Sequence, residues 1–100
     1  MYTFRKQPFE EITKGFDLTG KLPTGVTISS ATVSAVNDAT GFDATSTVLG
    51  STTATIESNI KMKVKCIAGD NGVDYKITFK GILNNGEKIE EDMLMEVRDL

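Results

Sequence analysis

The most regular alternation of apolar and polar residues lies over positions 60–66. Four apolar residues occupy the even positions and three lysines lie between them: Ile60, Met62, Val64 and Cys66, with Lys61, Lys63 and Lys65. Successive side chains of an extended strand point to opposite faces of its sheet. The pattern therefore predicts an antiparallel strand with one face in the core and the other in water.

Two further strands are expected on either side of Asn84-Asn85-Gly86, because apolar residues occupy the odd positions of both flanking segments. A two-residue loop at Asn85-Gly86 would place each inward residue opposite an outward one. A three-residue loop, closed by Gly86 in the left-handed conformation, pairs inward residues with each other. The predicted pairs are Val73 with Val97, Tyr75 with Met95, Ile77 with Met93 and Lys80 with Glu90.

The first half of the chain gives weaker signals. Ile12, Phe16 and Leu18 share even parity, and Pro23-Thr24-Gly25 supplies a turn. In the β-branched segment that follows, the apolar positions change parity at Ser29-Ser30, which predicts a β-bulge there. Residues 37–43 are expected to form a loop, and short strands are expected near Thr45–Leu49 and Thr52–Ser58.

These elements predict one all-β domain of about seven strands. A chain of 100 residues has room for a single domain, and turns at this spacing without helical periodicity indicate a sandwich or a small barrel. Residues 1–8 end in Pro8 and are expected to form an N-terminal arm or an edge segment. Residues 9–100 are expected to form a single β-sandwich domain.

Composition limits the chemistry that this domain can perform. The chain has no histidine and a single cysteine, Cys66, so it offers neither a Cys-His nucleophile nor an intramolecular disulfide. We expect Cys66 to behave as a small buried hydrophobe. A net charge of −3 disfavours nucleic acid as a partner, and no apolar stretch is long enough to span a membrane. The N-terminal residues lack the apolar segment of a secretory signal.

Acidic side chains are the remaining candidates for a catalytic or metal site. The cluster of Glu87, Glu90, Glu91 and Asp92 lies along one strand and is interpreted as a solvated face. Glu91 has the parity of the core residues. We interpret it as a charge that protects an edge or lies at an open strand end, in preference to a buried catalytic carboxylate. Oxygen-bearing turn residues could in principle bind calcium, but their spacing does not match an EF-hand: Asn37, Asp38, Asp43, Asp70, Asn71 and Asp74. We therefore expect no enzyme activity, cofactor, metal or small-molecule substrate.

Five residues are candidate protein contacts. Phe4 and Phe9 lie near the N-terminus, where an exposed aromatic side chain could anchor a partner. Lys61, Lys63 and Lys65 form a basic row on the outer face of their strand. This row lacks interleaved aromatic residues for base stacking, so it is interpreted either as a solvated face or as a contact for an acidic partner.

The order of motifs resembles that of a group of small proteins encoded by tailed bacteriophages and prophages. The resemblance covers nearly the whole chain. It is carried by the N-terminal Lys6-Gln7-Pro8, by Phe16-Asp17-Leu18, by the strand Thr27–Ala31, by Gly69, Gly72 and Tyr75, and by the final hairpin. A tryptophan often follows the aspartate in that group, and Leu18 occupies that position here.

The resemblance implies an immunoglobulin-like antiparallel β-sandwich that serves as a virion structural or assembly protein of the head, head–tail or tail region. It also implies assembly in the cytoplasm of a bacterial host. The expected partners are other phage structural proteins and further copies of the chain. The alternative is a cell-surface or secreted immunoglobulin-like module that binds protein or carbohydrate, which would need a signal peptide or flanking domains.

Overall fold

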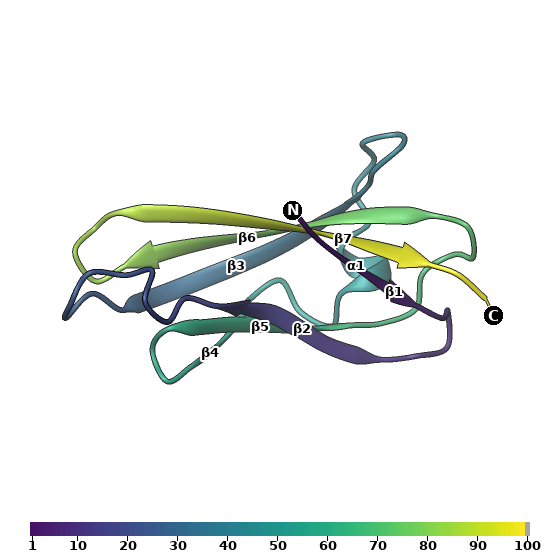
Figure 1. Ribbon diagram of the computed structural model, residues 1–100. Coiled ribbons are helices and arrows are strands. Elements are labelled where there is room, and N and C mark those ends of the chain that lie inside the picture. Colours follow the sequence, from purple (N-terminus) through teal and green to yellow (C-terminus); the bar gives the residue numbers. More distant parts are fainter. Residues whose placement is uncertain (100) are drawn as a thin grey trace.

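Two β-sheets pack face to face in the computed structural model, which describes residues 1–99 (Figure 1). The four-stranded sheet has the order β1 (Tyr2–Lys6), β7 (Lys88–Val97), β6 (Asp74–Leu83), β3 (Ile28–Asn37). The three-stranded sheet has the order β2 (Ile12–Asp17), β5 (Lys61–Cys66), β4 (Thr55–Glu57). One helical turn, α1 (Thr45–Val48), lies between β3 and β4. Neighbouring strands are antiparallel except β1 and β7, which are parallel. The all-β class is confirmed.

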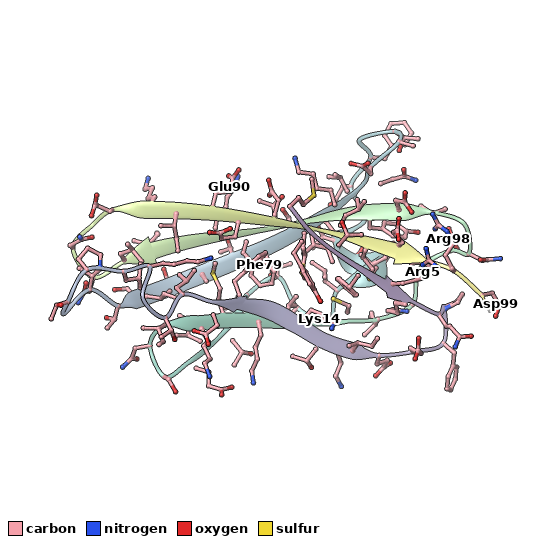
Figure 2. All side chains as sticks on the ribbon, in the orientation of Figure 1. Arg5, Lys14, Phe79, Glu90, Arg98 and Asp99 are labelled. Atoms are coloured by element: carbon pink, nitrogen blue, oxygen red, sulfur yellow. The ribbon has the colours of Figure 1, made fainter. Side chains whose placement is uncertain are left out.

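The core lies between the two sheets and is built from the alternate positions that the sequence predicted. Met62 and Cys66 of β5 are fully buried, as are Ile77 and Phe79 of β6. The ring of Phe79 meets the ring of Phe16, on β2 of the opposite sheet, edge to face at 5.5 Å between centroids. Figure 2 shows Phe79 between the sheets. The aromatic contact therefore joins the two layers.

The β6–β7 hairpin has the predicted register. Tyr75 pairs with Met95, Ile77 with Met93 and Lys80 with Glu90. Gly86 has a φ of +89°, and its N–H donates to the Leu83 carbonyl at 3.0 Å. Gly86 thus takes the left-handed conformation required to close a three-residue loop. The bulge in β3 is also confirmed, because its register with β6 shifts between Ile28 and Ser30.

The predicted strand at Thr45–Leu49 is wrong, because the chain forms the helical turn α1 there. The Asp43 carboxylate accepts hydrogen bonds from the Thr45 N–H at 3.2 Å and from its hydroxyl at 2.6 Å. The Ala44 carbonyl accepts from the N–H groups of Thr47 and Val48, both at 3.0 Å. The bonds from Thr45 to the Asp43 carboxylate form an Asx turn, which favours a helical backbone conformation over an extended one. The strand expected at Thr52–Ser58 is shorter than predicted and spans Thr55–Glu57.

The first residues of the chain are an edge strand and not a free arm. β1 runs parallel to the second half of β7, with Phe4 opposite Met95 and Lys6 opposite Val97. Its inward positions therefore belong to the same core as the predicted domain, whose last residue, Leu100, lies outside the described residues. Because β1 begins opposite Met93, β7 itself forms the edge of the sheet over residues 88–92.

One lateral side of the sandwich is closed and the other is open. On the β3 side, the segment between β3 and β4 covers the edge of β3. The Val33 N–H donates to the Thr52 carbonyl, and the Ala44 N–H donates to the Ala35 carbonyl. On the other side, no strand of residues 1–99 pairs with the outer edges of β1 and β2. Each bordering strand carries an inward-facing charge, namely Lys6, Lys14 and Glu91. Such charges oppose edge-to-edge pairing, and the partial exposure of Glu91 agrees with its interpretation as edge-protecting.

Candidate protein-contact surfaces

The three lysines of β5 lie on the outer face of the three-stranded sheet, and each has an acidic partner. The amine–carboxylate distance is 4.0 Å from Lys61 to Asp17 and 3.7 Å from Lys65 to Glu11. Lys63 forms a hydrogen-bonded ion pair with Glu57. The lysines are brought together as expected, but β2, β4 and the β1–β2 loop supply carboxylates beside all three. The row is therefore charge-balanced.

The pKa values of two of the neighbouring carboxylates, Asp17 and Glu57, are lowered. Lys63 lowers the pKa of Glu57 through a hydrogen bond and through its charge. The pKa of Asp17 is lowered mainly by hydrogen bonds from the hydroxyl and N–H of Thr19, and less by Lys61. Exposed ion pairs of this kind contribute little to the stability of a fold, because water and salt screen them. The row is better suited to keeping this face soluble than to attracting an acidic partner.

The two phenylalanines predicted as anchors have opposite surroundings. Phe4 is only 7% exposed, because the parallel pairing of β1 with β7 turns its side chain into the core. The expectation that Phe4 is an exposed aromatic side chain, on which its assignment as an anchor depended, is therefore wrong. Phe9 is 97% exposed, at the tip of the loop between β1 and β2. Among the described residues it is the most exposed large hydrophobic side chain.

Lys6 holds the loop that carries Phe9. Its side chain is 1% exposed, and its amine donates to the carbonyls of Gln7 at 2.7 Å and Pro8 at 3.2 Å. Burial lowers the pKa of Lys6, and the carboxylate of Glu10 is the strongest opposing influence. Glu10 also closes the loop, because its carboxylate accepts from the Gln7 N–H at 2.7 Å. Sequence reasoning missed this lysine, although it shares the parity of Tyr2 and Phe4.

Cys66 is fully buried at the end of β5. Burial, partly offset by the charges of Lys6 and Lys14, raises the pKa of its thiol to about 11 from an ordinary value of 9.0. The thiol is therefore neutral and packed among apolar groups. The burial of Cys66 agrees with its predicted role as a small hydrophobe.

We expect the raised pKa to appear in the pH dependence of stability. Because the folded chain holds the thiol proton more tightly than the unfolded chain, its contribution is complete below pH 9.0 and is lost as the pH rises toward 11. Between pH 8 and pH 10.5 this term should lower the free energy of unfolding by about 1–2 kcal/mol. Urea unfolding of the native chain and of Cys66→Ala gives the free energy of unfolding of each protein at each pH. The contribution of the thiol is the difference between the pH dependences of these two free energies. Equal slopes in the two proteins would contradict the assignment.

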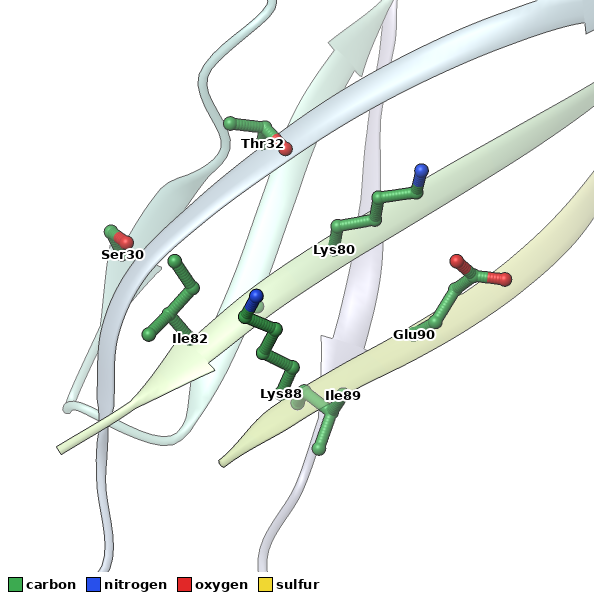
Figure 3. A pocket seen from close by; sticks show the side chains of 8 residues that line it. Ser30, Thr32, Lys80, Ile82, Lys88, Ile89 and Glu90 are labelled. Atoms are coloured by element: carbon green, nitrogen blue, oxygen red, sulfur yellow. The ribbon is translucent and has the colours of Figure 1, made fainter. Parts of the chain in front are cut away.

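A hollow of about 440 Å³ lies on the outer face of the four-stranded sheet, near the β6–β7 hairpin. The residues that line it come from three adjacent strands, and Figure 3 labels all of them except Gly81: Ser30 and Thr32 of β3, Lys80, Gly81 and Ile82 of β6, and Lys88, Ile89 and Glu90 of β7. Ile82 is 44% exposed although it lies on a central strand. The hollow therefore combines an accessible apolar side chain with charged and hydroxyl groups.

The two lysines of this hollow differ from the β5 row. Among residues 1–99, no carboxylate lies within ion-pair distance of Lys80 or Lys88. Glu90 is the cross-strand neighbour of Lys80 but forms no ion pair with it. The hollow thus has two uncompensated amines and one carboxylate around Ile82. A cross-strand parity argument could have identified Lys80, Ile82 and Lys88 as neighbours.

The acidic and turn residues considered for chemistry take part in local structure. Asp74 binds Arg98 at 2.7 Å, and the side-chain oxygen of Asn37 accepts from the N–H groups of Ala39 and Thr40. Residues 1–99 contain no group of three His, Cys, Asp or Glu side chains arranged to hold a metal ion. In the same part of the chain, no helix has the length and apolar character needed to cross a membrane.

No protein-family model, curated protein or solved structure matches this chain.

Proposed function

We propose that this protein is a non-enzymatic structural or assembly component of a bacteriophage particle, and that it works through contacts with other proteins. The observation that carries the proposal is the presentation of Phe9. A side chain that is 97% exposed sits on a loop fixed by buried Lys6. Aromatic side chains are frequent energetic centres of protein interfaces, and a preordered loop loses little conformational freedom on binding.

The order of strands supports an immunoglobulin-like topology for this sandwich. The order β2-β5-β4 corresponds to strands B, E and D of that fold, and β3-β6-β7 corresponds to C, F and G. β1 then takes the place of an A strand that pairs in parallel with G. The chain lacks the tryptophan and the disulfide of antibody domains.

Tyr75 supplies a second argument for this topology. It lies near the start of β6, is 3% exposed, and its hydroxyl accepts a hydrogen bond from the Asp70 N–H at 3.1 Å. A tyrosine at the start of strand F that bonds to the backbone a few residues upstream is the tyrosine corner of immunoglobulin-like domains. Asp70 and Tyr75 have that relation.

The phage assignment rests on the order of motifs along the chain. Phe16 and Asp17 end β2 and Leu18 follows directly. The strand motif Thr27–Ala31 includes the β3 bulge, and Tyr75 follows the glycine-containing turn. A structural role in a particle requires only a stable domain with accessible contact surfaces. The alternative carbohydrate-binding module would need an aromatic platform, whereas exposed Phe9 and Phe42 come from different loops and form no ring contact with each other.

The proposal is tested with particles purified from a lysate of the phage or induced prophage that encodes the chain. Mass spectrometry should detect the chain in density-purified particles, or its deletion should abolish particle formation while leaving structural proteins expressed. A deletion strain that yields normal infectious particles, together with absence of the chain from those particles, would overturn the proposal.

A further inference from the structure

The Phe9 loop and the hollow around Ile82 lie at opposite ends of the molecule. The N–H of Arg98, just beyond the end of β7, donates to the Lys6 carbonyl, so the Phe9 loop is next to the end of β7. The hollow is near the start of the same strand, at Lys88. β7 has ten residues, which corresponds to about 30 Å of extended chain. The two features also lie on different parts of the surface, one at a loop tip and one on an outer sheet face.

Their chemistry is complementary. The loop presents an exposed phenylalanine followed by two exposed carboxylates, Glu10 and Glu11. The hollow presents exposed Ile82 between the uncompensated amines of Lys80 and Lys88, with Glu90 as its one carboxylate. The loop therefore brings two negative charges to a site with an excess of one positive charge. An apolar contact surrounded by opposite charges favours one orientation of the partner.

We propose that copies of this chain associate head to tail, with the Phe9 loop of one copy seated in the Ile82 hollow of the next. This inference deepens the proposed function by naming a second copy as the partner of the Phe9 loop. Because the two contact surfaces differ, the association is heterologous. Such contacts close into rings or extend into filaments, which are the forms in which repeated structural subunits assemble.

Phe42, the other strongly exposed phenylalanine, fits the hollow less well. It is 76% exposed on the loop after β3. Only one carboxylate, Asp43, is next to Phe42 in sequence, and it binds Thr45 through Oδ1, whereas two carboxylates follow Phe9. Glu10 and Glu11 each use one carboxylate oxygen within their own molecule, in contacts to Gln7 and Lys65, and each keeps a second oxygen. The Phe9 loop is therefore the better partner for Lys80 and Lys88.

The open lateral side of the sandwich offers a poorer route to self-association. Pairing of free edges between copies would bring the inward charges Lys6, Lys14 and Glu91 toward the joint. The head-to-tail contact avoids these strands and uses side chains that are already exposed. A loop tip seated in a hollow of about 440 Å³ would form a small interface, and small interfaces are weak contacts that act through many copies.

Sedimentation velocity of the full chain tests the contact, from about 10 µM to about 1 mM, the range in which small interfaces dissociate. The native chain should show a mass that rises with concentration and passes that of a dimer. Phe9→Ser and Ile82→Ser should each raise the dissociation constant more than about tenfold. Phe42→Ser is the matched control and should associate like the native chain.

A mixture of the two variants distinguishes the head-to-tail arrangement from a symmetric one. Phe9→Ser retains a native hollow and Ile82→Ser retains a native loop, so an equimolar mixture should form heterodimers that grow no further. A native chain that stays monomeric throughout, variants that associate normally, or a mixture that stays monomeric would each overturn the inference. These outcomes are independent of whether the chain is found in particles, which tests the proposed function separately.

Discussion

Replacement of Phe79 by alanine is expected to lower the free energy of unfolding by about 3–5 kcal/mol. Phe79 is fully buried on the central strand β6 and meets Phe16 of the opposite sheet. Its removal deletes a large apolar side chain and leaves a cavity that rigid sheets fill only in part. Urea unfolding followed by circular dichroism measures the loss.

Ile82→Ala is the matched control, because Ile82 is an apolar residue of the same strand on the outer face of the sheet. It is 44% exposed, so its truncation should cost less than about 1 kcal/mol. Similar losses at the two positions would mean that β6 does not separate a dry face from a wet one. The assignment of inner and outer faces would then be wrong.

Gly15→Ala is expected to destabilise the chain by about 2–3 kcal/mol, although alanine normally suits a strand better than glycine. A Cβ at Gly15 would lie 2.0 Å from the Met62 carbonyl oxygen and 2.5 Å from the Lys63 Cα. Both are backbone atoms of β5, so β2 must move away from β5, the one strand that pairs with it among residues 1–99, to make room. The midpoint of urea unfolding should fall accordingly.

Gly50→Ala provides the control for this substitution. A Cβ there would meet its nearest atoms, on Lys65, at 3.6 Å, an ordinary contact distance. The free energy of unfolding should change by about 0.5 kcal/mol or less. If Gly15→Ala proved equally harmless, the close approach of β2 to β5 would be contradicted.

The sequence was most informative where a single physical rule acts over many positions. Alternation over positions 73–97, combined with one loop-length choice, led to the register of Ile77 with Met93, because a one-residue slip would expose the whole apolar set. The bulge at Ser29-Ser30 followed from the same rule. Local contacts override this signal at α1, where the Asp43 side chain turns a β-rich segment into a helical turn.

Features that depend on pairing between strands far apart in the sequence could not be predicted from alternation. Nothing in residues 1–8 indicates that they pair in parallel with β7, and that pairing buries Phe4 and Lys6. The lysine row was identified correctly as a surface feature, but the acids that neutralise it come from three other segments. The exposure of Phe9 could be predicted from the sequence. Prediction of the hollow at the opposite end would require the pairing registers of β3, β6 and β7 together.

Two-dimensional NOE spectra of the labelled chain test the two-sheet architecture most directly. In the observed register, Thr78 faces Asp92 at a position where the strands exchange no hydrogen bond, so their Hα protons should give a strong cross-peak. Ring protons of Phe16 and Phe79 should give cross-peaks between the sheets. A Thr78–Met93 Hα contact in place of Thr78–Asp92, or an absence of contacts between the two rings, would contradict the account.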